Sequence, residues 1–223
     1  MLERFAIITG GGLGLRMNGT VPKQFLLLGG LPVIMHTLQQ FAPFCKNIVV
    51  PLPENYHDFW EDLQKEHHFS IPHTLVCGGK TRFESVRNAL KYIPAKGLVA
   101  IHDAVRPFIS KNLIEKCFQQ AEKQGNAISS QPITESLRMA DNGTTKSIDR
   151  TLFYRIQTPQ VFQCSDIKEA YNQDYCKTFT DDATVLESKG GDIHLVEGEE
   201  QNIKITTPMD LFLAENLIEK WNK

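Results

Sequence analysis

Basic side chains flank a glycine-rich stretch near the start of the chain. Residues 9–25 read TGGGLGLRMNGTVPKQF and contain five of the chain's 15 glycines, together with Arg16 and Lys23. Glycines allow successive backbone N–H groups to turn toward one anion, and they let that anion approach closely. Arg16 can bind phosphate oxygens with a fork of N–H groups, and Lys23 adds a point charge. A tight turn would explain the glycines alone, but the two cations favour a phosphate site.

Two common nucleotide-binding motifs are absent from this stretch. The dinucleotide motif G-x-G-x-x-G would need glycine where Leu15 or Met17 stands. The P-loop motif fails because Thr20 and Val21 follow Gly19. The absence of the dinucleotide motif therefore argues against a nicotinamide-dependent oxidoreductase, which we keep as the third alternative.

A second cluster, IHDAVRPF at residues 101–108, places Asp103 and Arg106 directly after an apolar run. In open parallel sheets, ligands bind just outside the carboxyl ends of the strands. A carboxylate and a guanidinium at such a place suit a ribose hydroxyl, a metal ion or a substrate phosphate. The alternative is an internal Asp–Arg ion pair that ties a loop. We interpret His102 as a packing residue.

Two later segments add a hydroxyl and more cations. The segment 149–162 reads DRTLFYRIQTPQVF and carries Arg150 and Thr158. The segment 197–211 reads EGEEQNIKITTPMDL and places Lys204 between two isoleucines. Burying this ammonium group unpaired would cost several kcal/mol, so we expect it to meet an anion. An edge strand with Lys204 pointing outward is the alternative.

Apolar runs alternate with amphipathic segments along the whole chain, and these elements must position the candidate residues. With 223 residues, 41% hydrophobic and 22% charged, the composition is that of one globular domain, 1–223. The predicted strands cover 5–9, 47–51, 73–77, 98–102, 127–130 and 192–196, and the predicted helices cover 31–41, 55–66, 81–93, 111–124, 165–173, 181–189 and 208–221. This alternation predicts a doubly wound α/β fold with a mostly parallel sheet.

Three predicted helices begin with recognisable local signals. Thr81 and Glu84 match a capping box, and Thr207 precedes Pro208 at a first helical position. The run TDD at 180–182 places carboxylates at the positive end of a helix dipole. We interpret all three as structural signals.

One segment interrupts the α/β alternation. Residues 133–150 read ITESLRMADNGTTKSIDR, with alternating polarity around Asn142 and Gly143, which predicts a hairpin inserted at about 133–152. Arg150 follows at its foot. A lone hairpin is marginally stable in water and needs a packing partner. That partner is either a second copy of the chain, which would make the hairpin a dimerisation arm, or the chain's own domain.

Charge and cysteine content exclude several classes. A net charge of −2 argues against a general nucleic-acid or membrane-binding surface. The five cysteines are widely spaced and form no C-x-x-C pair, which argues against a disulfide framework or a zinc site. We expect free thiols and a cytoplasmic protein, because the start of the chain also lacks the features of a signal peptide. No apolar run approaches 18 residues, so no membrane span is predicted.

Taken in order, these motifs resemble one known family. G-G-G-x-G-x-R-M, P-K-Q-F, G-G-x-x-R-x-x-S-V, H-D-A-V-R-P, T-P-Q-x-F, T-D-D-A and N-I-K-I-T-T-P-x-D-L are similar to the motifs of the 2-C-methyl-D-erythritol 4-phosphate cytidylyltransferases, from about residue 4 to 218. The resemblance implies a Rossmann-type nucleotidyltransferase fold. It also implies that CTP and the polyol phosphate give 4-diphosphocytidyl-2-C-methyl-D-erythritol and pyrophosphate, in non-mevalonate isoprenoid biosynthesis. Ribitol-5-phosphate cytidylyltransferase is the alternative within the same group.

The resemblance also implies a role for each candidate residue. Glycines of the first loop would line the nucleotide site, Gly79 and Ser85 would read the cytosine, and Arg82 of the same motif would support them. The hairpin would exchange across a homodimer, so that Arg150 would serve the partner's site. The implied nucleotide-binding residues are Gly10, Gly11, Gly12, Gly79, Arg82, Ser85, Asp103 and Ala104; the catalytic residues are Arg16, Lys23, Arg150 and Lys204; and the polyol-phosphate residues are Arg106, Ser136 and Thr158.

The implied reaction needs no general base, because a phosphate monoester is mostly dianionic near neutral pH. Positioning and electrostatic stabilisation of two anions must then lower the barrier. Mg²⁺ is expected on the triphosphate, where it keeps several waters, and Asp103 is the one candidate protein ligand for it. A catalytically silent nucleotide-binding module is the alternative from another class, and the cations expected at both reacting phosphates argue against it.

Overall fold

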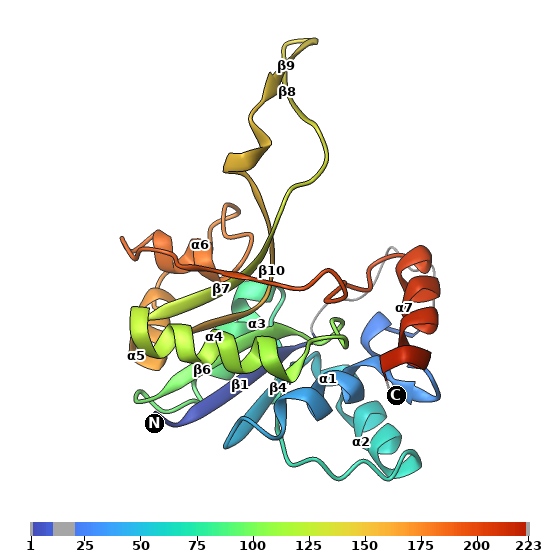
Figure 1. Cartoon of the computed structure of the whole chain (residues 1–223). Coiled ribbons are helices and arrows are strands. Elements are labelled where there is room, and N and C mark those ends of the chain that lie inside the picture. Colours follow the sequence, from blue (N-terminus) through green and yellow to red (C-terminus); the bar gives the residue numbers. More distant parts are fainter. Residues whose placement is uncertain (1, 11–20, 222–223) are drawn as a thin grey trace.

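A seven-stranded sheet forms the centre of the molecule (Figure 1). The computed structural model describes residues 2–10 and 21–221. The strands, in spatial order, are β11 (Leu195–Glu197), β7 (Asn126–Pro132), β10 (Tyr154–Gln163), β6 (Leu98–Asp103), β1 (Arg4–Thr9), β4 (Asn47–Leu52) and β5 (Thr74–Cys77). Every pairing is parallel except those of β10, which runs antiparallel to β6 and β7. The predicted mostly parallel α/β fold is therefore confirmed.

Helices cover both faces of this sheet, as a doubly wound fold requires. Ile8 of β1 packs in one apolar cluster with Leu38, Trp60 and Phe118, and the neighbouring Ile7 belongs to the cluster on the opposite face. Successive strand side chains point to opposite faces, so a continuous apolar run such as β1 can serve both layers. The helices are α1 (Val33–Phe41), α2 (His57–Glu66), α3 (Arg82–Leu90), α4 (Lys111–Gln124), α5 (Cys164–Ala170), α6 (Asp182–Glu187) and α7 (Pro208–Trp221).

The strand β10 has no counterpart among the strands predicted from sequence, although it lies between β6 and β7 near the centre of the sheet. Pro159 lies inside it, and the pairing with β7 shifts register between Ile156 and Gln160. A proline removes one ladder donor and obscures the alternation that identifies a strand. A short hairpin of β2 (Leu27–Leu28) and β3 (Leu31–Pro32) is also additional to the prediction.

The predicted inserted hairpin is present and stands away from the body of the molecule (Figure 1). It consists of β8 (Leu137–Asp141) and β9 (Thr144–Ile148). Asn142 and Gly143 at its tip have φ values of 43° and 84°, the left-handed conformation that an Asn-Gly turn favours. We call residues 133–156 the arm.

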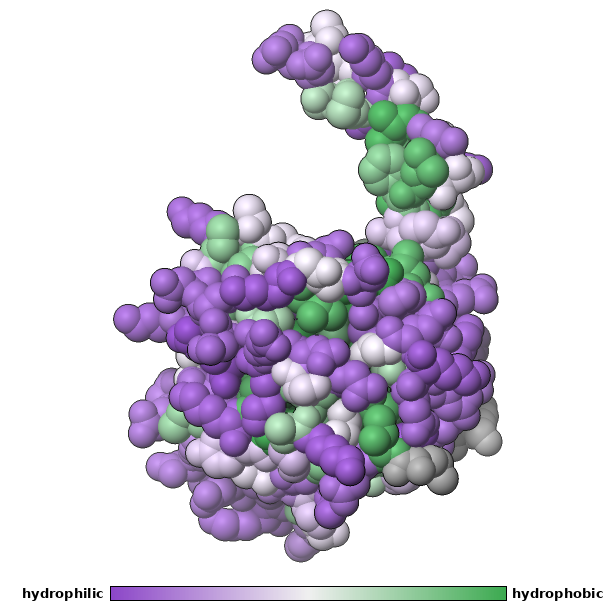
Figure 2. Space-filling view, turned by 90° about the vertical axis from the view of Figure 1, so that its left-hand side faces the viewer, coloured by the Kyte–Doolittle hydropathy of each residue, from purple (hydrophilic) through white to green (hydrophobic). Residues whose placement is uncertain are grey.

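Several large apolar side chains of the arm are exposed. Leu152 is 76% exposed, and apolar surface gathers along the part of the arm nearer the body (Figure 2). Met139, Phe153, Tyr154 and Ile156 are the other exposed apolar residues. Apolar surface of this kind, rimmed by polar residues, is typical of an interaction site.

After β11 the chain crosses the sheet and reaches α7 as an extended segment, residues 198–207 (Figure 1). Glu199 accepts hydrogen bonds from the backbone and side chain of Ser110 at the start of α4. The Ile205 N–H donates to the Val105 carbonyl at 2.9 Å. These contacts fix the segment beside the end of β6. It forms no strand, so the alternative of an edge strand with an outward Lys204 does not hold.

Among the described helices, none has the length and apolar character needed to cross a membrane.

Candidate active site

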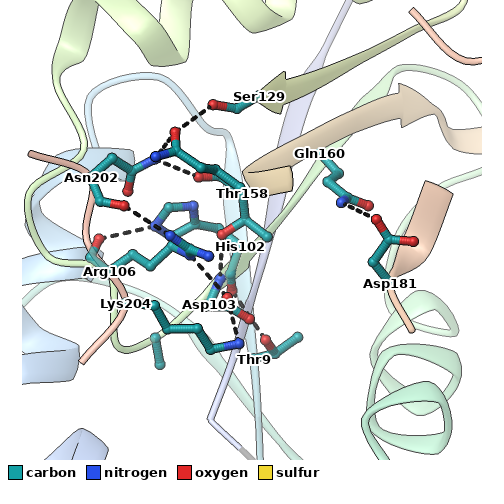
Figure 3. Close-up of polar contacts among 12 residues, drawn as sticks. Thr9, His102, Asp103, Arg106, Ser129, Thr158, Gln160, Asp181, Asn202 and Lys204 are labelled. Atoms are coloured by element: carbon teal, nitrogen blue, oxygen red, sulfur yellow. Dashed lines mark hydrogen bonds and ion pairs between the residues drawn. The ribbon is translucent and has the colours of Figure 1, made fainter. Parts of the chain in front are cut away.

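Three cations, Lys204, Arg106 and Arg82, surround the carboxylate of Asp103 at the carboxyl end of β6. Figure 3 shows the first two of them. Lys204 Nζ lies 3.0 Å from Oδ2, and Arg106 Nε lies 3.1 Å from the same oxygen. Arg82 Nε lies 3.7 Å from Oδ1. The Asp103 side chain is only 7% exposed, so these contacts form in a poorly solvated place. The expectation that Lys204 meets an anion is confirmed. The Asp103–Arg106 ion pair, the alternative to a ligand-binding role for these two residues, is also present.

The surrounding charges decide the ionisation of this site. Burial alone would raise the pKa of Asp103, but Lys204, Arg82 and Arg106 hold it well below its usual range. The neighbouring His102 is fully buried, and burial lowers its pKa to about 4. Its ring Nε2 lies 3.1 Å from the Arg106 carbonyl (Figure 3). The site near neutral pH therefore contains an ionised Asp103 and a neutral His102, which packs against Phe41 as expected.

Arg82 is held from behind by a second carboxylate. Its two terminal nitrogens donate to Asp182 Oδ1 and Oδ2 at 2.8 and 2.6 Å. The Tyr171 hydroxyl donates to Asp182 Oδ1 at 2.6 Å. Asp182 has no exposed surface and occupies the first turn of α6. Sequence reasoning missed this role, because Asp181 and Asp182 were both interpreted as helix-start residues, whereas only Asp181 caps α6.

A network of hydrogen bonds to backbone groups and uncharged side chains supports Asp103 and Arg106 from the other side. The Asp103 N–H donates to Thr158 Oγ1 at 3.1 Å. Arg106 Nη1 donates to the Asn202 carbonyl at 2.8 Å, and Asn202 Nδ2 donates to the Thr158 carbonyl at 2.8 Å. Thr158 lies in β10 and Asn202 in the extended segment, so the network joins β6, β10 and that segment (Figure 3). Asn202 carried no signal in the sequence beyond its place in the last motif.

These residues open into a cavity of about 550 Å³, a size typical of small-ligand sites. Its polar end contains Arg82, Asp103, Arg106, Lys204 and Thr158. Its other end is lined by apolar side chains of β7, β10 and β11, among them Ile128, Ile156 and Leu195. Asp181, which caps α6, and Thr184 in its first turn add polar groups there. The structure thus brings together five of the predicted site residues, two predicted for the nucleotide side (Arg82 and Asp103) and three for the polyol-phosphate side (Arg106, Thr158 and Lys204).

The structure describes some, but not all, of the residues predicted to bind the nucleotide. Gly10 follows β1, and its carbonyl accepts a hydrogen bond from Gln24 Nε2 at 2.6 Å. This bond connects Gly10 to the short helical turn Lys23–Phe25. It therefore holds the residue next to Lys23 beside the end of β1. Gly11, Gly12 and Arg16 lie outside the described residues. Ala104 is fully buried, and its N–H donates to the Thr9 carbonyl at 3.0 Å.

Gly79 and Ser85 form one unit at the start of α3. The Gly79 N–H donates to Ser85 Oγ at 2.9 Å, and this hydroxyl donates to the Thr81 carbonyl at 2.9 Å. The capping box of Thr81 and Glu84 is present as predicted. A Cβ at Gly79 would lie 2.2 Å from Glu84 Cβ, so only glycine fits there. Ser85 therefore shapes the Gly79 loop, and a direct contact with cytosine stays a prediction.

Ser136 and Arg150 lie on the exposed arm and do not line the cavity of their own chain. The Arg150 guanidinium donates to the Thr134 carbonyl within the arm. Their predicted part in substrate binding therefore requires an arm from elsewhere.

The described residues contain no group of three or more His, Cys, Asp or Glu side chains that could hold a metal ion. The Asp103 carboxylate is surrounded by three cations, which would repel a divalent metal at that position. The donor set near the cavity thus fits anions far better than a protein-bound metal ion.

Comparison with known proteins connects this geometry to one family. A model of IspD, 2-C-methyl-D-erythritol 4-phosphate cytidylyltransferase, matches residues 5–220. The enzyme of that name from Porphyromonas gingivalis is 47% identical over 97% of this chain and 98% of its own length. The corresponding enzyme from Bacteroides thetaiotaomicron is 44% identical over 97% of this chain and 100% of its own length.

Solved structures agree with the sequence relatives. The crystal structure of 4-diphosphocytidyl-2C-methyl-D-erythritol synthase from Anaerococcus prevotii matches with a TM-score of 0.82 at 27% identity, covering 97% of this chain and 98% of its own. The 2-C-methyl-D-erythritol 4-phosphate cytidylyltransferase from Thermus thermophilus matches with a TM-score of 0.77 at 29% identity, covering 98% and 100%. The resemblance inferred from the motifs is confirmed, and the chain belongs to the 2-C-methyl-D-erythritol 4-phosphate cytidylyltransferase family.

Proposed function

We propose that the chain transfers a cytidylyl group from CTP to 2-C-methyl-D-erythritol 4-phosphate, releasing pyrophosphate and forming 4-diphosphocytidyl-2-C-methyl-D-erythritol for isoprenoid biosynthesis. One observation carries most of the argument. Lys204, Arg106 and Arg82 converge on a single buried carboxylate at the polar end of the cavity. A concentration of positive charge beside the carboxyl end of β6 suits a ligand with several phosphate charges.

The polyol phosphate would bind at the polar end of this cavity. Lys204 and Arg106 each contact the same oxygen of Asp103. Asp103 therefore holds both cations in position, and their other N–H groups can donate to a phosphate. Thr158 Oγ1 lies on the same side. A phosphate oxygen then attacks the α-phosphorus of CTP in line with the departing pyrophosphate. The dianion needs no base, which agrees with the neutral, fully buried His102.

The nucleotide would bind across the ends of β1, β5 and β6. In this proposal Gly79 and Ser85 read the cytosine, while Asp103 and Ala104 lie near the ribose. Gly10, Gly11 and Gly12 line the triphosphate, and Arg16 and Lys23 stabilise the charge that develops on the α-phosphorus and the leaving group. Family members generally use a divalent cation, and we propose Mg²⁺ held by the triphosphate oxygens and water, where it would neutralise phosphate charge.

The chain would act as a homodimer of one-domain subunits, residues 1–223, in which the insertion predicted at about 133–152 is the core of the arm. The exposed apolar side chains of the arm need a packing partner, and a second copy supplies one. Arg150 and Ser136 would then reach the partner's polyol-phosphate site. All five cysteines are free thiols, which fits a reducing compartment and a cytoplasmic enzyme.

The test is pyrophosphate release by the purified full-length chain with Mg²⁺, supplying CTP or UTP and either 2-C-methyl-D-erythritol 4-phosphate or ribitol 5-phosphate. We expect release only with CTP and the methylerythritol phosphate. Preference for ribitol 5-phosphate would transfer the assignment to the related wall-precursor enzyme. No release with any pair, together with CTP binding in a thermal-shift assay, would identify a silent nucleotide-binding module.

A further inference from the structure

Tyr171 and Asp182 form a buried polar pair behind the cavity. Asp182 has no exposed surface and Tyr171 is 2% exposed. The Tyr171 hydroxyl donates to Asp182 Oδ1 at 2.6 Å. Burial raises the pKa of Tyr171 well above its usual value, as does the adjacent Asp182, so the hydroxyl keeps its proton and stays a donor. A carboxylate in such a place must have partners, because an unpaired buried charge is strongly destabilising.

Arg82 connects this pair to the active site. Its Nη1 and Nη2 atoms are both used by Asp182, at 2.8 and 2.6 Å. Its Nε lies 3.7 Å from Asp103 Oδ1. The fork on Asp182 therefore sets how close Arg82 comes to Asp103 and which oxygen it faces. Burial would lower the pKa of Arg82, but the two carboxylates raise it, so it remains charged.

This arrangement leaves the other oxygen of Asp103 to the substrate-side cations. Lys204 and Arg106 both contact Oδ2, at 3.0 and 3.1 Å. An Arg82 released from Asp182 could place its own fork on Asp103, because two parallel N–H···O bonds are the preferred geometry for a guanidinium and a carboxylate. It would then compete directly with Lys204 and Arg106 for that carboxylate.

We propose that Tyr171 and Asp182 are positioning residues of the active site, which hold Arg82 so that Asp103 can orient Lys204 and Arg106. Neither residue lines the cavity, so both act through Arg82. The inference rests on the function proposed above, since it assigns Lys204 and Arg106 to the polyol phosphate.

A purely structural role is the competing explanation for Tyr171. Its ring stacks on Phe83 with centroids 4.7 Å apart and an interplanar angle of 22°. Tyr175 contacts the same Phe83 ring at 5.8 Å, yet it is 44% exposed and its hydroxyl is outside the Asp182 network. Both tyrosine rings contact Phe83, but only the Tyr171 hydroxyl bonds Asp182. Tyr175→Phe is therefore a matched control for Tyr171→Phe, because it removes a hydroxyl outside this network.

The experiment compares the steady-state kinetics and melting temperatures of the parent, Tyr171→Phe, Tyr175→Phe and Asp182→Asn. We expect Tyr171→Phe to lower kcat/KM for the polyol phosphate by about three- to tenfold, the effect of one hydrogen bond, and to raise the KM for CTP by a smaller factor, because Asp103 also lies near the proposed ribose site. Asp182→Asn should have a larger effect of the same kind, and Tyr175→Phe should match the parent. An inactive parent would contradict the proposed function instead.

A double-mutant cycle tests the route through Arg82. Arg82→Lys keeps the charge but loses the fork. If Tyr171 acts through Arg82, adding Tyr171→Phe to Arg82→Lys should change kcat/KM by less than about twofold. Equal, additive losses in both backgrounds would overturn the proposal. So would a change confined to the KM for CTP, or a lower melting temperature with unchanged kinetics.

Discussion

Lys204 Nζ lies 3.0 Å from Asp103 Oδ2, which ties the extended segment near the end of the chain to the last residue of β6. The pair is asymmetric, because the Lys204 side chain is 38% exposed and that of Asp103 only 7%. Asp103 is therefore the fixed partner, and Lys204 is the one that can reach into the cavity. Since Arg106 and Arg82 also compensate Asp103, the ammonium group can leave without exposing an unpaired buried charge.

Removal of this ammonium group should therefore affect activity far more than folding. We expect Lys204→Met to lower kcat by about 10²–10³, the typical loss for one preorganised charge donor. The melting temperature should change little, because Asp103 keeps two guanidinium partners. Lys46→Met, which removes an exposed lysine paired with Glu3, is the control and should retain parental activity. A Lys204→Met enzyme within threefold of the parent would contradict the proposed role.

Ser85→Ala tests the nucleotide side. The Ser85 hydroxyl joins the Gly79 N–H to the Thr81 carbonyl, and the residue is 1% exposed. Its loss leaves the loop without this support, so we expect the KM for CTP to rise about three- to tenfold, with a smaller preference for CTP over UTP. Ser165→Ala, at the exposed start of α5, serves as control. Unchanged nucleotide selectivity would show that this loop does not read the base.

The sequence predicted those features of the fold and the site that depend on one short segment. The Asn-Gly turn predicted the hairpin, and an Asp103–Arg106 ion pair was one of the two interpretations of the polar residues after the apolar run 98–101. The position of Lys204 between isoleucines predicted a buried anionic partner, since a lone ammonium group is too costly to bury. In each case the physical requirement is met by a few neighbouring residues.

Features that depend on several segments were missed. Asp182 satisfies a helix-start pattern on its own, so nothing in the sequence required a second role for it. In the sequence, Tyr171 looks like any core aromatic residue. Its role depends on the contact of its hydroxyl with Asp182, which only the structure shows. The strand β10 was hidden by Pro159, and its place in the sheet depends on pairing with both β6 and β7.

His102 should contribute to the pH dependence of stability. Burial lowers its pKa in the folded chain to about 4, below the ordinary value of 6.5. As the pH falls below about 6.5 the unfolded chain binds a proton that the folded chain does not, so the free energy of unfolding decreases down to about pH 4, by about 3 kcal/mol in total. Above pH 6.5 this contribution is fully present.

Urea unfolding of the parent and His102→Gln between pH 5 and pH 8 measures this contribution. Glutamine can still donate to the Arg106 carbonyl but does not titrate, so the variant should lose less stability than the parent toward pH 5. His67→Gln, at the end of α2, should follow the parent. Parallel curves for the parent and His102→Gln would show that His102 is not the titrating group.

The arm makes the sharpest prediction, because it distinguishes a site completed by a second chain from one completed within its own. Arg150→Ala should mainly raise the KM for the polyol phosphate. Arg138→Ala, whose guanidinium bonds Thr145 within the same hairpin, should behave like the parent. Co-expression of Arg150→Ala and Lys204→Met chains with different affinity tags allows the mixed dimers to be isolated.

If arms exchange, each mixed dimer contains one site with both defects and one site with neither. Its activity should then recover to about half that of the parental dimer, although both homodimers are impaired. An arm that serves its own chain would leave every site with one defect. The mixed dimer would then be as impaired as the two mutant homodimers. A chain that sediments as a monomer at assay concentration would reject the shared site directly.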